Sequence, residues 1–336
     1  MKSILWLFVV LLASPVYADV TKLVNEGTAL HDSGRYDEAI AKFKAALEED
    51  PSSVLASYEL ALTYQAKGDT AQCVAILEPL ARTKNKFQAA LHAVLGNCYD
   101  IGGDPQRAIA TYRKGLKIDG KDTQLLYNLA VTLAARGEYD EARKLLKHEL
   151  ALVPTHRSGH YLLGQIFEAQ NFRIPATLSF LRFLSLEPVS DRAKDAAARA
   201  IALLGAGIEV KDKGNVNITI DSNPRKEEGD YSGVEMMMAF AGTVQLLPEN
   251  ENKSEFEKKL AHVSKALAMI VEAQGPKRDY TSQHVIPFFR TLYDKELLDA
   301  FAAAAISSLR FEGSAEWSLA NPEAIHKYAQ FIGGTK

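Results

Sequence analysis

A repeat of about 34 residues constrains this chain more than any other feature. Five similar segments begin at Val20, Val54, Ala89, Thr123 and Arg157, at offsets of 34, 35, 34 and 34 residues. Repeats of this length accommodate two helices and a turn, and such units bury their apolar faces only by stacking on one another. The sequence therefore predicts a helical solenoid of five helix pairs.

The segments carry small and large residues at matching positions. In the first segment, Gly27 stands at the eighth position, Gly34 lies in the turn and Phe43 stands at the twenty-fourth position. A small residue at the eighth position lets the paired helices approach closely, and the large residue is expected to fill the gap to the next pair. The fifth segment departs from this pattern, because Gln170, Asn171 and Phe172 stand where a glycine-containing turn is usual.

These residues at this period resemble the tetratricopeptide-repeat family over residues 20–190, about half of the chain. The resemblance implies a mainly α, right-handed solenoid within residues 19–206. An Ala-rich amphipathic helix, residues 190–205, is expected to cap the last repeat, since the end of a solenoid must cover its apolar face. Residues 208–336 are expected to form a small, mostly α C-terminal domain with one or two strands.

The resemblance places the binding surface in the groove that is lined by the first helix of each pair. The predicted peptide-binding residues are Tyr58, Leu62, Gln65, Asn97, Tyr127, Val131, Tyr161 and Gln165. The groove positions include no Lys or Arg, so a clamp for a peptide's terminal carboxylate is not expected. The tyrosines suit a peptide held by stacking and neutral hydrogen bonds. Alternatively, they contact one another or the C-terminal domain.

The N-terminus has the pattern of a secretory signal peptide over residues 1–18. Lys2 precedes an apolar run from Ile4 to Ala13, and Val16-Tyr17-Ala18 provides a cleavage site after Ala18. The apolar run is too short for a helix that spans a bilayer of about 30 Å. The sequence therefore predicts a periplasmic or secreted protein without an integral membrane span after cleavage.

The C-terminal part changes from repeats to an irregular pattern. The alternation in Val216–Ile220 predicts a strand, and Ser232 with Glu235 predicts a capping box for a helix that ends at Leu247. Further helices are expected at 253–273, at 281–309 with a break near Asp294, and at 322–332. The strand leaves open the pairing of two chains by edge addition, which would make the protein a homodimer.

The sequence contains no motif for a catalytic, cofactor-binding or metal site. Asp279, Tyr280 and His284 are near enough in sequence for proton transfer, although such a trio also arises in ordinary surface turns. Cys73 and Cys98 are either two small buried residues or, because their helices are neighbours, a disulfide. A net charge of −3 with evenly spread basic residues argues against nucleic-acid binding.

The sequence therefore predicts an exported scaffold or adaptor that binds a protein or peptide in the cell envelope, without catalysis and without a cofactor. The alternative is a small-molecule binder or enzyme with its site in the C-terminal domain or at its junction with the repeats. A deep pocket that gathers Asp279, His284 or Glu312 would favour this alternative.

Overall fold

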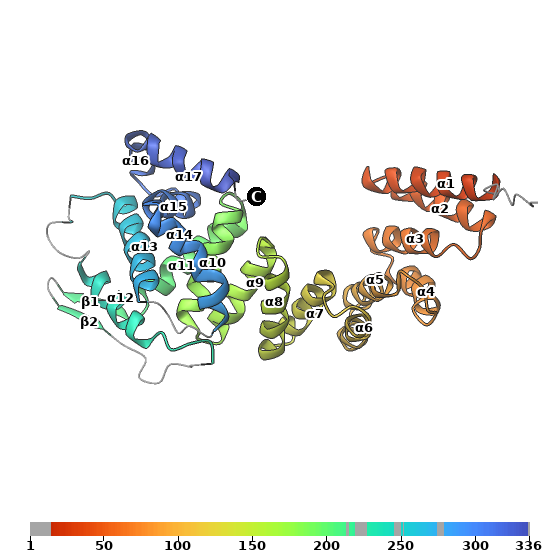
Figure 1. Ribbon diagram of the computed structural model, residues 1–336, viewed down its shortest axis with the longest axis horizontal. Coiled ribbons are helices and arrows are strands. Elements are labelled where there is room, and N and C mark those ends of the chain that lie inside the picture. Colours follow the sequence, from red (N-terminus) through yellow and green to blue (C-terminus); the bar gives the residue numbers. More distant parts are fainter. Residues whose placement is uncertain are drawn as a thin grey trace, which may run out of the picture. The chain divides into compact units, whose positions relative to one another are not determined.

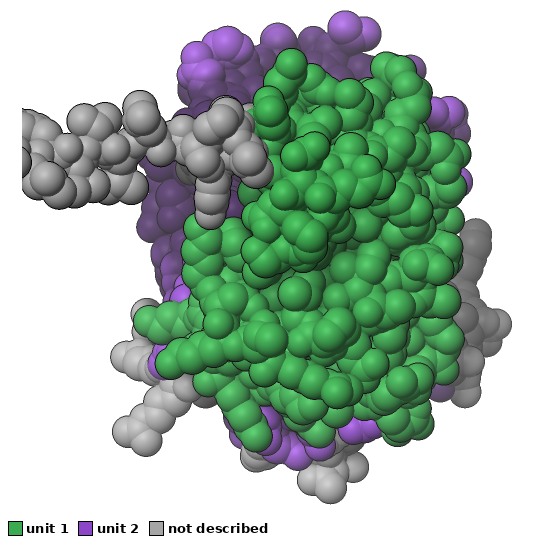
Figure 2. Space-filling model, turned by 90° about the vertical axis from the view of Figure 1, so that its right-hand side faces the viewer, with its two compact units in different colours: residues 1–136 green, residues 137–336 purple. Residues whose placement is uncertain are grey.

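The chain forms two compact units, unit 1 with residues 1–136 and unit 2 with residues 137–336 (Figure 1, Figure 2). The computed structural model describes residues 15–212, 215–218, 227–244, 250, 252–273 and 279–334. The division falls inside the fourth repeat. The domain boundary predicted near residue 207 lies within unit 2 and stays a prediction.

Unit 1 is built from helices that pack on their sequence neighbours. Its helices are α1 Pro15–Asp32, α2 Tyr36–Glu49, α3 Val54–Ala66, α4 Thr70–Leu80, α5 Gln88–Ile101, α6 Pro105–Ile118 and α7 Thr123–Ala135. The predicted two-helix period is therefore confirmed here. Most of the predicted signal peptide, residues 1–14, lies outside the described residues, and α1 extends across the predicted cleavage site after Ala18.

Glycine at the eighth repeat position gives the paired helices room for an aromatic ring. A Cβ atom added to Gly27 would lie 2.6 Å from the ring of Phe43, and one added to Gly96 would come even closer to Tyr112. The large residue at the twenty-fourth position thus packs against the glycine of its own pair, rather than only toward the next pair as predicted. In unit 2, Gly164 and Phe180 repeat this arrangement at 2.8 Å.

The turn within each pair uses a left-handed backbone conformation. Gly34, Gly68, Gly103 and Gly137 have φ between 76° and 81°. At the equivalent position of the fifth repeat, Asn171 has φ 63°. Asparagine adopts this region more readily than most residues, because its short polar side chain bonds locally. Asn171 therefore preserves the turn of the fifth repeat, although it stands where the other repeats have glycine.

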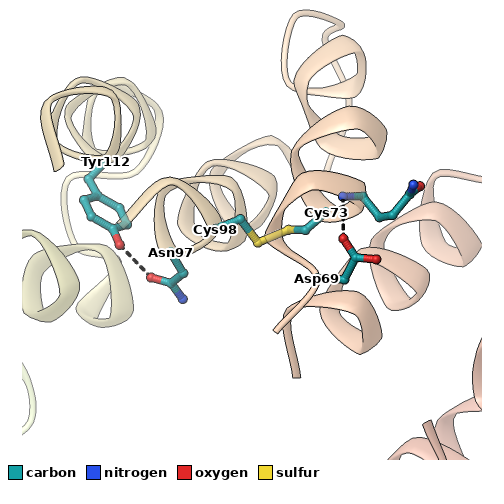
Figure 3. The surroundings of a disulfide bond; sticks show 6 residues. Asp69, Cys73, Asn97, Cys98 and Tyr112 are labelled. Carbon is teal, nitrogen blue, oxygen red and sulfur yellow. Dashed lines mark hydrogen bonds between the residues drawn. A yellow bond between two sulfur atoms is a disulfide. The ribbon is translucent and has the colours of Figure 1, made fainter. Parts of the chain in front are cut away.

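A disulfide joins α4 to α5 in unit 1. Cys73 and Cys98 are both buried, and their Cα atoms are 6.3 Å apart, within the usual range for a disulfide (Figure 3). Of the two alternatives that the sequence left open, the structure has the bonded one. The two bridged helices are joined by a long connection. Helix α4 ends at Leu80, directly after Pro79, and the seven residues 81–87 lead to α5.

Unit 2 contains the remaining repeat helices and the C-terminal helices. The helices are α8 Tyr139–Leu152, α9 Arg157–Ala169, α10 Arg173–Leu186, α11 Asp191–Gly205, α12 Ser232–Val244, α13 Glu255–Glu272, α14 Ile286–Asp294, α15 Leu298–Ile306, α16 Ser314–Ala320 and α17 Pro322–Gly334, with a π-helix η2 at Thr281–Val285 and a 3₁₀ turn η3 at Ser307–Leu309. The strands are β1 Ile208–Asp212 and β2 Asn215–Ile218.

The core of unit 2 is shared between repeats and C-terminal helices. Helix α10 packs on α9, α11, α15 and η2, and α11 also packs on α12, α13 and α15 (Figure 1). The predicted capping helix is thus present as α11, but C-terminal helices cover it in turn. Across the described part of the chain, no helix combines the length and apolar character that crossing a bilayer requires.

Two local predictions in the C-terminal part need correction. β1 pairs antiparallel with β2, with Ile208 opposite Ile218, so the predicted strand at 216–220 has a partner strand that was not located from the sequence. Residues 219 and 220 of the predicted strand, and residues 245–247 of the predicted helix, lie outside the described residues.

The predicted capping box is not made by Ser232, because its hydroxyl bonds to Asp230. A capping box is instead made by Ser254 and Glu257 at the start of α13. The predicted helices at 253–273 and 322–332 correspond to α13 and α17.

Candidate functional site

Six of the eight predicted binding residues lie on the first helices of the repeats in unit 1, and this set is called the inner surface below. They are Tyr58, Leu62 and Gln65 on α3, Asn97 on α5, and Tyr127 and Val131 on α7. All six side chains are partly or largely exposed. Whether they bind a peptide stays a prediction, because their placement alone does not test binding.

Asn97 is held in a defined orientation at the centre of this surface. Its Oδ1 atom accepts a hydrogen bond from the Tyr112 hydroxyl at 2.7 Å and another from Asn128 Nδ2 at 2.8 Å. Figure 3 shows the Asn97 amide nitrogen turned away from Tyr112. Burial raises the pKa of Tyr112, so its hydroxyl remains a donor at neutral pH. The amide nitrogen of Asn97 is thus available in a fixed position for a hydrogen bond to a ligand.

Polar contacts between successive inner helices were not foreseen from the sequence. His31 Nδ1 lies 2.9 Å from Thr63 Oγ1, which links α1 to α3. Thr132 donates to Asp100 at 3.1 Å, which links α7 to α5. Both pairs are 32 residues apart, close to the repeat period, so this spacing was a signal that could have been used to find them. These contacts stiffen the surface from which the candidate residues project.

The electrostatics of the inner surface are neutral to acidic. Burial raises the pKa of the Glu59 carboxyl, and the nearby His31 partly opposes this shift. Burial also raises the pKa of the Tyr58 hydroxyl, with smaller contributions from Glu59 and Asp122. A surface of this kind favours hydrogen bonding and stacking over pairing with a carboxylate.

A cavity of about 360 Å³ lies at one end of the inner surface and is called the N-terminal pocket below. Its lining residues are Val20, Thr21, Val24 and Asn25 from α1, Asp50, Ser52 and Ser53 from the α2–α3 turn, Val54 and Leu55 from α3, and Asn85, Lys86 and Phe87 from the α4–α5 connection. Nothing in the repeat pattern had indicated this pocket. The extra residue in the second repeat was the signal that could have suggested it.

The other two predicted binding residues, Tyr161 and Gln165, lie on α9 in unit 2. The Tyr161 hydroxyl donates to Asp195 of α11 at 2.7 Å, and its ring packs against Phe183 at 5.1 Å. Burial and this hydrogen bond raise the pKa of Tyr161 to about 12. Tyr161 thus contacts its own chain, but these partners lie on α10 and α11 rather than at another groove tyrosine or in the predicted C-terminal domain.

The trio considered for proton transfer is separated by its own contacts. The Asp279 carboxylate accepts hydrogen bonds from the Ser282 hydroxyl at 2.6 Å and the Tyr231 hydroxyl at 3.1 Å. Tyr280 instead stacks on His284, with ring centroids 4.9 Å apart. The Asp279 carboxylate is thus occupied by hydrogen bonds at the start of η2. Asp279 and His284 therefore do not form a proton-transfer pair.

A cavity of about 270 Å³ in unit 2 lies among α13, α15, α16 and α17. Small residues dominate its walls, including Ala300, Ala303, Ala304 and Ser307, and neither His284 nor Glu312 lines it. Within the described residues, no group of three His, Cys, Asp or Glu side chains could hold a metal ion. Neither observation favours the enzyme alternative.

Comparison with known proteins supports tetratricopeptide repeats within residues 30–166. A tetratricopeptide-repeat family model matches residues 30–98 and 102–166. The chain is 26% identical over 123 residues to the general transcriptional corepressor trfA of Dictyostelium discoideum, covering 36% of this chain and 9% of that protein. It is 22% identical over 179 residues to DnaJ homolog subfamily C member 3 of Gallus gallus, covering 49% of this chain and 35% of that protein.

A solved structure shows the same kind of fold. Pseudomonas aeruginosa pilF is similar with a TM-score of 0.51 and 15% identity, over 56% of this chain and 84% of that one. A thermophilic tetratricopeptide-repeat protein of Thermus thermophilus has a TM-score of 0.45 and 22% identity, over 55% and 98%. The similarity to pilF is evidence for the fold alone. The chain spans only a minor part of the two curated relatives, so their activities do not transfer to it.

Proposed function

We propose that this chain, with its tetratricopeptide repeats, is a scaffold that holds a segment of a protein partner against the inner surface of unit 1. One observation carries the proposal: the inner-surface side chains of unit 1 remain partly exposed while the helices that bear them are linked by polar contacts. A stiff surface with exposed tyrosines and amides suits binding, because little side-chain freedom is lost on association.

The proposal includes a location outside the cytoplasm. The apolar run from Ile4 to Ala13 has the length of a signal-peptide core. The Cys73–Cys98 disulfide is consistent with this location, because such bonds persist in oxidising compartments and are rare in the cytosol. A location in the cell envelope or in the medium would satisfy both observations.

The test is site-specific photocrosslinking in envelope extract of the native host. A benzophenone amino acid replaces Leu62 on the inner surface or, as the control, Gln106, an exposed residue of the outer helix α6. We expect a discrete adduct from position 62 and none from position 106. Adding Tyr58→Ala and Tyr127→Ala should weaken the adduct from position 62.

The same experiment can contradict the proposal. Equal adducts from positions 62 and 106 would mean that the inner surface is not the preferred binding surface. An adduct from position 62 that persists unchanged with both tyrosines removed would mean that these rings do not contribute. Circular dichroism of each variant checks that a lost adduct does not reflect lost folding.

A further inference from the structure

We infer that the N-terminal pocket receives a large apolar side chain of the bound partner and anchors the end of its segment. This inference rests on the proposed function, because it names the chemistry that the partner must present. The pocket volume of about 360 Å³ falls within the range of ordinary ligand pockets and is ample for a leucine or aromatic side chain.

The pocket is a local departure from the repeat pattern. The turns from α2 to α3 and from α6 to α7 have four residues each, whereas seven residues connect α4 to α5. Within this connection, Asn85 accepts a hydrogen bond from the Phe87 backbone at 2.9 Å and donates to the Thr83 carbonyl at 3.1 Å. The longer connection is therefore braced, and Asn85, Lys86 and Phe87 form one wall.

The opposite rim is also held by its own hydrogen bonds. Asp50 accepts from the Ser52 backbone at 3.0 Å and from the Ser52 hydroxyl at 2.7 Å. Ser53 caps α3 by accepting from the Ala56 backbone at 3.3 Å. These hydrogen bonds hold the α2–α3 turn that forms this rim. The rim shapes the pocket before the partner arrives.

The remaining surface of the pocket is largely apolar. Val20 and Val24 of α1 form part of its floor, while Leu55 of α3 keeps 42% of its surface exposed. Phe87 completes the wall, with the Lys86 ammonium 4.9 Å from the centre of its ring. Covering an exposed leucine and a phenylalanine is favourable in proportion to the apolar area removed from water. The occupant that fits is a leucine, phenylalanine or tryptophan side chain.

The pocket is continuous with the inner surface along one helix. Leu55, Tyr58 and Leu62 are spaced at i, i+3 and i+7 on α3, so they share one helix face. A segment that inserts an apolar side chain beside Leu55 can continue past Tyr58 toward Leu62. The pocket thus fixes the register of the segment, and the tyrosine contacts follow from that register.

The first test uses N-acetyl-phenylalanine amide as the probe and N-acetyl-alanine amide as its matched control. With methyl-labelled full-length protein, we expect the phenylalanine probe to shift the NMR signals of Val20, Val24 and Leu55 at millimolar concentration. Thr21 is exposed at the pocket, so Thr21→Trp should fill the pocket and abolish the shifts, whereas Ala41→Trp on the exposed face of α2 should not. Equal shifts by both probes, no shifts, or shifts that survive Thr21→Trp would overturn the inference.

A second measurement separates this inference from the proposed function. We expect Thr21→Trp to reduce the photocrosslinked adduct from position 62, because the anchor is lost. An adduct of unchanged yield would leave the proposed function standing and show that the partner does not use the pocket. No adduct from position 62 in any variant, with probe binding intact, would reject the proposed function and keep the pocket as a site for apolar side chains.

Discussion

Tyr58 in unit 1 and Tyr161 in unit 2 stand at the same position of their repeats, yet they have different surroundings. Tyr58 is partly exposed on the inner surface. Tyr161 bonds to Asp195 of α11 and lies 5.8 Å below the Arg192 guanidinium. The repeat pattern therefore determines which helix face a residue occupies. Both side chains stay partly exposed, and the segments that follow the last repeat decide whether the side chain is also bonded to its own chain.

One segment of unit 2 that follows the last repeat is attached through a buried charge. The Glu228 side chain is 3% exposed and lies 2.7 Å from Lys147 Nζ and 2.9 Å from Arg143 Nε. Arg143 also lies over the Phe172 ring at 4.7 Å. The segment around Glu228 is thus tied to α8, a helix of the fourth repeat. In unit 1 the repeat helices are instead joined by the disulfide between α4 and α5.

The largest effect is expected from breaking the charge cluster of unit 2. Glu228→Ala leaves Arg143 and Lys147 without their buried counterion. This change should lower the free energy needed to open this part of unit 2 by about 3–5 kcal/mol. Native-state hydrogen exchange should show faster exchange in α8 and unchanged exchange in α3 and α5. The control, Glu316→Ala, removes an exposed carboxylate on α16 of the same unit. Similar exchange in both variants would show that the cluster does not hold this segment.

The next largest effect should fall on unit 1. Replacing both Cys73 and Cys98 by alanine removes the crosslink and should lower stability by about 2–4 kcal/mol, since the open chain gains conformational freedom. Hydrogen exchange should then increase in α4 and α5 but not in α13 or α15. Treating the unaltered protein with dithiothreitol under conditions that expose the bond should reproduce the result. An equal loss of protection in unit 2 would contradict the separation of the two units.

A pH-dependent loss of stability is expected in unit 2. Burial lowers the pKa of His160 to about 4, below the ordinary value of 6.5. Between these values the unfolded state binds a proton that the folded state does not, so stability falls as the pH decreases from 6.5 to 4. The loss contributed by this group should approach roughly 3 kcal/mol. Urea unfolding at several pH values should show a weaker dependence in His160→Asn, and an unchanged dependence would exclude His160 as its source.

The smallest effect is expected when the hydroxyl groups of Tyr161 and Tyr58 are removed one at a time. Tyr161→Phe removes the hydrogen bond to the partly exposed Asp195 and should cost about 1 kcal/mol. Tyr58→Phe should change stability by less than about 0.5 kcal/mol, as expected for a surface substitution. Thermal unfolding of both variants tests the difference. A larger loss for Tyr58→Phe would mean that this hydroxyl has a structural role on the inner surface.

The repeat length, the helix pairing, the turn positions and the capping helix could all be predicted from the sequence. These features depend on contacts between residues close in the chain, such as Gly27 with Phe43, and such contacts leave a periodic pattern. The same pattern located the helices that carry the inner surface. It could not distinguish Tyr58 from Tyr161, because both residues satisfy the same local rule.

Only the tertiary structure decided which of these side chains are bonded to their own chain and where the pocket lies. The N-terminal pocket and the Glu228 cluster join residues without a shared local pattern, and Lys147 and Glu228 are 81 residues apart. A charged residue in a loop has the same sequence signature whether it faces solvent or is buried with a counterion. For Glu228, only its placement against Arg143 and Lys147 of α8 shows which of the two applies.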